Sequence, residues 1–172
     1  TQVKPLQDPA NPGTGIGQGV AQLTGPTIRL TNATLDGATG AAPVAIASFT
    51  TLALGGSLLD MTNSTLDTTG ICTVCIVAIP FFGDVLQLDP STMVKTFGTA
   101  PLITMSAGSH ILAGNIVSLF GTSATDSVLA LSGPLLVANG SVIDALRIID
   151  ISSGTVVATT LQPLVQLTGT PL

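Results

Sequence analysis

The stretch Leu30-Thr31-Asn32-Ala33-Thr34-Leu35-Asp36 recurs, with two changes, as Met61-Thr62-Asn63-Ser64-Thr65-Leu66-Asp67. In both copies, short alternations of apolar and polar residues flank an asparagine, and this pattern is typical of two β-strands joined by a turn. Two copies of one segment, beginning at Leu30 and at Met61, indicate an array of similar structural units.

Two interleaved families of short strands extend this repeat along the chain. The first family consists of apolar–polar–apolar triplets, and their last residues recur at nearly even spacing: Leu30, Met61, Leu88, Leu119 and Ile151. The second family lies half a period away and begins at Pro43, Thr73, Pro101, Pro134 and Pro163. A period of about thirty residues built from short strands predicts an all-β fold, namely a parallel β-helix (β-solenoid) of about five coils.

Stacking of the coils predicts which side chains face inward. We expect the last residues of the first family (Leu30, Met61, Leu88, Leu119 and Ile151) to form one inward ladder. The second family then presents an apolar outer face, which is a candidate lateral interface: Val44, Ile46, Val74, Ile76, Leu102, Leu135, Val137 and Leu164. An antiparallel sandwich uses the same turn residues, but it does not explain two interleaved families.

The N-terminal segment, residues 1–24, breaks the repeat. It is rich in Gly and Pro, so we expect an extended N-terminal arm over residues 1–24 and the solenoid domain over 25–172. One interpretation is an arm that lies along a neighbouring subunit, with Val3, Leu6, Ile16 and Val20 as anchors. The other is a flexible terminus.

Composition excludes several classes of protein. Of the 172 residues, 45% are hydrophobic and 8% are charged, and the net charge is −5. This is too apolar for disorder and too acidic for a nucleic-acid-binding protein. The most apolar run, residues 71–82, is too short to span a bilayer. Because the chain begins at Thr1 without a leader, we expect a mature secreted form. Such a weakly charged surface suits contact with copies of itself.

Few residues suggest chemistry. We expect a disulfide between Cys72 and Cys75; buried thiols or an intersubunit bridge are alternatives. A redox motif would need a helix, and a zinc site would need four ligands. His110 is expected at a solvated turn. We therefore predict no enzyme activity, no catalytic residue, no cofactor, no metal and no small-molecule substrate. Three glycosylation sequons, at Asn32, Asn63 and Asn139, are also interpreted as turn asparagines.

In its repeats of Leu, Val and Ile with Ser, Thr, Asn and Gly corners, the chain over residues 25–172 resembles bacterial β-solenoid surface proteins of the filamentous-haemagglutinin and autotransporter-passenger type. The resemblance implies a secreted, surface-attached or fibrous protein and assigns no functional residue. We expect a homopolymer that grows head to tail through uncapped solenoid ends. The alternative is a non-polymerising adhesin fragment that binds a cell surface or glycan. Ice binding is disfavoured, because the positions after Thr31 and Thr62 in that column are expected to be Asp89, Phe120 and Ser152.

Overall fold

The computed structural model describes residues 19–36, 44–46, 50–72, 79–122 and 126–169. These residues form β-strands and no helix. Every strand pairing among them is parallel except that of β8 with β9. The expected all-β class and the parallel pairing are confirmed.

The parallel strands form three sheets. Sheet A contains, in spatial order, β1 (Gly19–Leu23), β5 (Thr50–Leu54), β11 (Met93–Thr96), β14 (Ser127–Leu131) and β17 (Gly154–Ala158). Sheet B contains β2 (Ile28–Thr31), β6 (Leu59–Thr62), β12 (Ile103–Ser106), β15 (Leu136–Asn139) and β18 (Val165–Thr168). Sheet C contains β3 (Thr34–Asp36), β7 (Thr65–Asp67), β13 (His110–Leu119), β10 (Leu86–Leu88), β4 (Val44–Ile46) and β16 (Val142–Ile151), and β16 pairs with β13.

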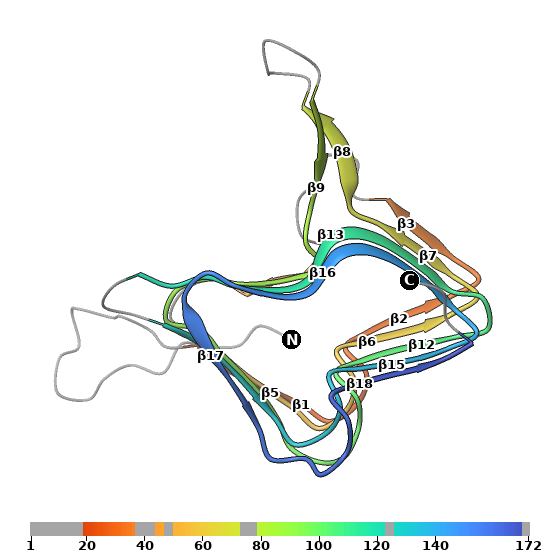
Figure 1. The fold of residues 1–172 in the computed structure, drawn as a ribbon. Coiled ribbons are helices and arrows are strands. Elements are labelled where there is room, and N and C mark those ends of the chain that lie inside the picture. The colour runs from red at the N-terminus through yellow and green to blue at the C-terminus, as the bar shows by residue number, and fades with distance from the viewer. Residues whose placement is uncertain (1–18, 37–43, 47–49, 73–78, 123–125, 170–172) are drawn as a thin grey trace, which may run out of the picture.

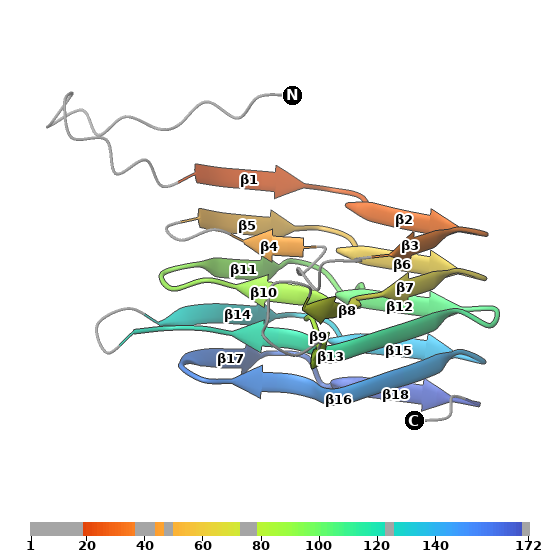
Figure 2. The ribbon, with the colours of Figure 1, turned by 90° about the horizontal axis from the view of Figure 1, so that it is seen from above.

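The chain visits the sheets in the order A, B, C and then returns to A. Viewed along the stack, the three sheets surround a common interior (Figure 1). Viewed from the side, equivalent strands lie one above another (Figure 2). The interior is a single cluster of aliphatic side chains, including Leu54, Met61, Leu88 and Leu119, all fully buried. This arrangement of stacked parallel sheets is consistent with a β-helix.

The expected boundary between arm and solenoid is wrong by several residues. Strand β1 pairs with β5 over its whole length, from Gly19 with Thr50 to Leu23 with Leu54. Residues 19–23, including Val20, therefore belong to sheet A because their extended backbone continues its hydrogen-bond ladder. The other expected anchors of the arm, Val3, Leu6 and Ile16, lie outside the described residues.

The single inward ladder expected from the first family is also wrong. Leu30 and Met61 are neighbours in sheet B, and the next residue in that column is Met105. Leu88, Leu119 and Ile151 instead form a ladder in sheet C. The two families exchange sheets after residue 67 because the β8–β9 hairpin lengthens that part of the chain, which the period of the repeat does not reveal.

Several side chains expected on an outer apolar face belong to the core. Leu102 and Leu135 are fully buried, although each precedes a buried strand residue, Ile103 or Leu136. They lie just before β12 and β15, where the chain turns from sheet A to sheet B, and strand alternation does not hold at such a corner. The remaining expected positions divide as follows: Val44 and Leu164 pack against the core, Val137 is half-buried, and Val74, Ile76 and the side chain of Ile46 lie outside the described residues.

One hairpin interrupts the stack. Strands β8 (Thr69–Cys72) and β9 (Ile79–Phe82) pair in antiparallel fashion and project from sheet C (Figure 1). At its base, the amide of Gly83 donates to the carbonyl of Thr68 at 2.9 Å, and the Thr68 hydroxyl donates to the Gly83 carbonyl at 2.6 Å. The amide of Gly114 also donates to Gly83. The two ends of the hairpin are thus anchored next to each other in the stack.

Because Thr68 and Gly83 are already hydrogen-bonded, removal of the hairpin should leave the stack intact. We expect a variant in which two glycines replace residues 69–82 to keep its β-sheet circular dichroism. Its free energy of unfolding should change by less than about 1 kcal/mol, which corresponds to about 2–4 °C in Tm. Loss of a cooperative thermal transition in this variant would show that the hairpin is needed for folding.

Candidate assembly surfaces

The C-terminal end of the stack consists of β16, β17 and β18, and among the described residues no strand lies beyond them (Figure 2). Burial along the sheet C ladder shows how open this end is. Leu88 and Leu119 are 0% exposed, whereas Ile151, the last residue of the ladder, is 49% exposed. Leu146 and Val157 at this end are also exposed. The last strands therefore present apolar side chains and a sheet edge with no neighbouring strand among the described residues.

The N-terminal end, formed by β1, β2, β3 and β4 (Figure 2), has the same character. Leu35 is 38% exposed, whereas its ladder neighbour Leu66 is 1% exposed and Ile111 is fully buried. In sheet B, Leu30 is only partly buried, whereas Met61 below it is fully buried. Both ends of the described stack therefore leave core ladders incompletely covered.

The corner between sheets B and C has the same backbone conformation at every turn. The residue after each sheet B strand has a positive φ, between 48° and 56°: Asn32, Asn63, Ala107, Gly140 and Gly169. Asparagine and glycine adopt this left-handed region most readily. The side-chain amide of Asn63 also donates to the Asn32 side-chain oxygen at 2.8 Å. The interpretation of Asn32 and Asn63 as turn residues is confirmed. Asn139 is instead the last residue of β15, and the residue with positive φ at that corner is Gly140.

Substitutions at Asn63 should separate backbone conformation from side-chain hydrogen bonding. Asn63→Val places a β-branched residue at positive φ and should cost about 1–2 kcal/mol of unfolding free energy. Asn63→Gly loses only the amide contact and should cost about 1 kcal/mol or less. Urea unfolding followed by circular dichroism measures both. Equal effects of the two substitutions would contradict a backbone origin.

A buried serine follows this corner in successive turns. Ser64, Ser109 and Ser141 are almost fully buried. Each hydroxyl donates to the carbonyl two or three residues earlier, at 2.6–3.1 Å. The Ser64 and Ser109 hydroxyl oxygens also accept backbone amides from the preceding turn, those of Ala33 and Ser64. These serines satisfy buried backbone groups, so their role is structural.

The outer face of sheet B carries a polar column that the sequence register misplaced. Thr31 and Thr62 are in register with Ser106, Asn139 and Thr168, and not with Asp89, Phe120 and Ser152. The expectation that Asp89, Phe120 and Ser152 continue the column of Thr31 and Thr62 is therefore wrong. Beside it, Arg29 Nε lies 3.1 Å from Asp60 Oδ2 in an exposed ion pair.

The residues weighed for chemistry are not brought together. Cys75 and the Cys72 side chain lie outside the described residues, so their disulfide stays a prediction. His110 begins β13 and is half-buried, with Nε2 buried and unpartnered among the described residues; the expected solvated turn is wrong. No group of three or more potential metal ligands occurs in the described part of the chain. None of its described segments is a helix long and apolar enough to cross a membrane.

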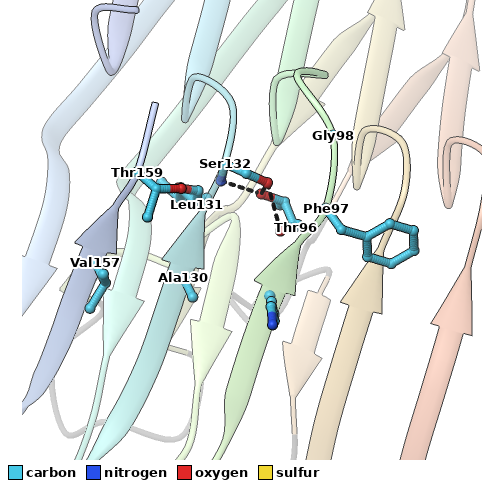
Figure 3. A pocket seen from close by; sticks show the side chains of 9 residues that line it. Thr96, Phe97, Gly98, Ala130, Leu131, Ser132, Val157 and Thr159 are labelled. Carbon is cyan, nitrogen blue, oxygen red and sulfur yellow. Dashed lines mark hydrogen bonds between the residues drawn. The ribbon is translucent and has the colours of Figure 1, made fainter. Parts of the chain in front are cut away.

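A groove lies on the outer side of sheet A, where β11, β14 and β17 approach the corner to sheet B (Figure 3). Lys95, Ala130 and Val157 are in register on these strands. The ring of Phe97 covers Gly55, where an added Cβ would come within 2.9 Å of it. We call this the sheet A groove; its lining residues are Lys95, Thr96, Phe97, Gly98, Ala130, Leu131, Ser132, Val157 and Thr159.

No protein-family model, curated protein or solved structure matches this chain.

Reasoning from the sequence missed the sheet A groove, because its residues come from three turns of unequal length. Met93 of β11 pairs with Val128 of β14, whereas Ser127 of β14 pairs with Gly154 of β17, so the first of these turns is several residues longer than the second. A fixed period cannot align Lys95, Ala130 and Val157. The alternation of small or apolar residues within β14 and β17 is the only signal in the sequence, and by itself it does not distinguish a groove from a flat face.

Proposed function

We propose that this chain is a structural subunit of a secreted extracellular filament. Each copy forms a β-solenoid of five coils, and copies stack head to tail through their open ends. Residues 1–18 of one copy bridge to its neighbour. The observation that carries the proposal is the incomplete burial of the core ladders at both ends of the described stack, as in Leu35 and Ile151. The arrangement requires no cofactor, metal or substrate.

The two ends are suited to each other in register. If the parallel stacking continues between copies, Val165 and Leu167 of one copy cover Ile28 and Leu30 of the next, because these are the terminal residues of the same sheet B columns. Ile143 similarly covers Leu35 in sheet C. Apolar groups then meet apolar groups, and the unpaired strand edges complete their ladders. Because the two surfaces differ, the contact is heterologous and produces an open filament.

Negative-stain microscopy of the concentrated full chain tests the proposal. Fibres of uniform width are the expected result, because one repeated heterologous contact fixes the filament geometry. Dispersed short rods at high concentration would contradict polymerisation, and they would favour the alternative of a non-polymerising adhesin fragment.

Assembly should depend on salt. Each copy carries a net charge of −5, and continued register places Asp144 of one copy beside Asp36 of the next. Added salt screens this repulsion, since the Debye length falls from about 30 Å at 0.01 M to about 10 Å at 0.1 M. Light scattering should therefore show faster assembly at the higher salt concentration.

The charge variant Asp144→Asn should reduce this salt dependence. The matched control is Asp126→Asn, which removes the same charge from the exposed residue before β14, one strand inside the end of sheet A. Asp126 Oδ1 accepts the Ser153 hydroxyl at 2.7 Å, and the asparagine oxygen can accept the same hydrogen bond. Equal salt dependence in the two variants would mean that net charge alone, and not the stacked ends, controls assembly.

A further inference from the structure

The sheet A groove offers a mainly apolar surface with one cation. Ala130, Val157 and Phe97 supply carbon surface, and Val157 and Phe97 are well exposed. Lys95 is the only charged residue of the lining, and it is exposed. Such a surface fits an apolar side chain with a carboxylate nearby.

The polar groups of the groove are engaged within the fold. The Thr96 hydroxyl oxygen accepts the Ser132 amide at 2.8 Å, and the Ser132 hydroxyl donates to the Thr96 carbonyl at 2.7 Å (Figure 3). The Thr159 amide donates to the Leu131 carbonyl at 2.9 Å. With these groups satisfied, a ligand that depends on several hydrogen bonds finds few partners here, whereas an apolar side chain can bind without displacing a hydrogen bond.

We propose that residues 1–18 of one copy occupy the sheet A groove of the neighbouring copy. This inference rests on the proposed head-to-tail filament and names the surface that receives the arm. In continued register, β1 of the incoming copy lies next to β17 of its neighbour, at one strand spacing of about 4.8 Å, and Gly19 stands opposite Gly154. The arm therefore begins three residues, about 10 Å, before Val157 along the neighbour's β17. The groove is thus continuous with the proposed junction.

The arm has the length and side chains that the groove requires. Fully extended, residues 1–18 reach about 60 Å, whereas the groove crosses three strands of sheet A, a width of about 10 Å. Residues 1–18 contain one carboxylate, Asp8, two positions after Leu6. Two positions apart in an extended segment, both side chains point to the same side. Leu6 then contacts Ala130 in the sheet A groove, and Asp8 faces Lys95. The glycines between Pro12 and Gly19 allow the chain to turn back from β1.

Cross-linking between copies tests the inference. Two forms of the full chain, both with Cys72→Ser and Cys75→Ser, are mixed under oxidising conditions: an isotope-labelled one with Leu6→Cys and an unlabelled one with Ala130→Cys. Because each chain has one cysteine, a mixed disulfide forms only between copies. The control partner carries Ala53→Cys, which lies in the same outward column of sheet A but outside the groove. We expect at least tenfold more mixed dimer, measured by mass spectrometry, with Ala130→Cys than with Ala53→Cys.

A charge exchange provides a second measurement on the same mixture. Lys95→Asp in the Ala130→Cys chain should lower the yield of mixed dimer at least fivefold, and Asp8→Lys in the Leu6→Cys chain should restore it. Fibres that form with equal cross-linking at positions 53 and 130, or with none, would overturn the groove assignment and leave the filament standing. No fibres by microscopy and no mixed dimer would overturn both. Preferential cross-linking at position 130 with charge rescue supports the assignment.

Discussion

Leu167→Lys is expected to stop filament growth while the monomer still folds. Leu167 lies on β18, the last strand of sheet B, and is only partly buried, so a lysine there can extend its ammonium into water. In the filament, the same ammonium would be enclosed against Leu30 of the next copy, and an unpaired buried charge costs several kcal/mol. We expect the concentration needed for assembly to rise by about 100-fold or more, or about 2.8 kcal/mol.

Thr168→Lys is the matched control, because Thr168 is the next residue on β18 and is exposed. It should assemble like the unmodified chain.

Because growth is head to tail, the Leu167→Lys variant allows a second measurement, the inhibition of assembly. A Leu167→Lys copy keeps an intact N-terminal end, so it can join a growing filament and then block further addition. Small amounts should therefore inhibit assembly of the unmodified chain in light-scattering experiments. Equal assembly of both variants, or no inhibition, would contradict head-to-tail growth through this end.

Leu119→Ala is expected to produce the largest loss of monomer stability. Leu119 is fully buried between Leu88 and Ile151 in the sheet C ladder. Truncation of a buried leucine leaves a cavity and typically costs about 2–5 kcal/mol. Urea unfolding monitored by circular dichroism, in the Leu167→Lys background to prevent assembly, measures the change in unfolding free energy.

Ile151→Ala is the control from the same ladder. Because Ile151 is 49% exposed at the end of the stack, its truncation should cost the monomer about 1 kcal/mol or less. In the unmodified background it should nevertheless weaken assembly, since a neighbouring copy would bury this side chain. A larger loss of monomer stability from Ile151→Ala than from Leu119→Ala would contradict the burial gradient along the ladder.

The repeat predicted the class of fold but not its register. Short strands with Asn and Gly corners predicted β-structure, because period-two alternation and turn residues are local signals. The two interleaved families, with a period of about thirty residues, predicted that the strands stack in parallel. Met61 was nevertheless assigned to the column of Leu88, although its neighbour is Met105. An inserted hairpin changes the number of residues per turn without changing the stacking, and no local signal marks whether extra residues stay in the stack or leave it.

The alternation of side chains along a strand also gave wrong predictions for residues at the corners between sheets. Leu102 and Leu135 were expected outside, because the residue after each was expected inside, yet both members of each pair are buried. Where the backbone turns between sheets, consecutive side chains can point into the same interior. Much of the expected lateral apolar face therefore belongs to the core, and the candidate assembly surfaces move to the two ends of the stack and the sheet A groove.

The axial rise per subunit in the filament tests head-to-tail stacking most directly. In the described part of the chain, sheets A and B contain five strands each. Neighbouring strands are about 4.8 Å apart, so continued stacking predicts a rise of about 24 Å with strands perpendicular to the fibre axis. Helical reconstruction from cryo-electron micrographs measures both quantities. A rise of five strand spacings per copy, with perpendicular strands, is the predicted result. Strands along the fibre axis, or a repeat of two copies related by a two-fold axis, would contradict it.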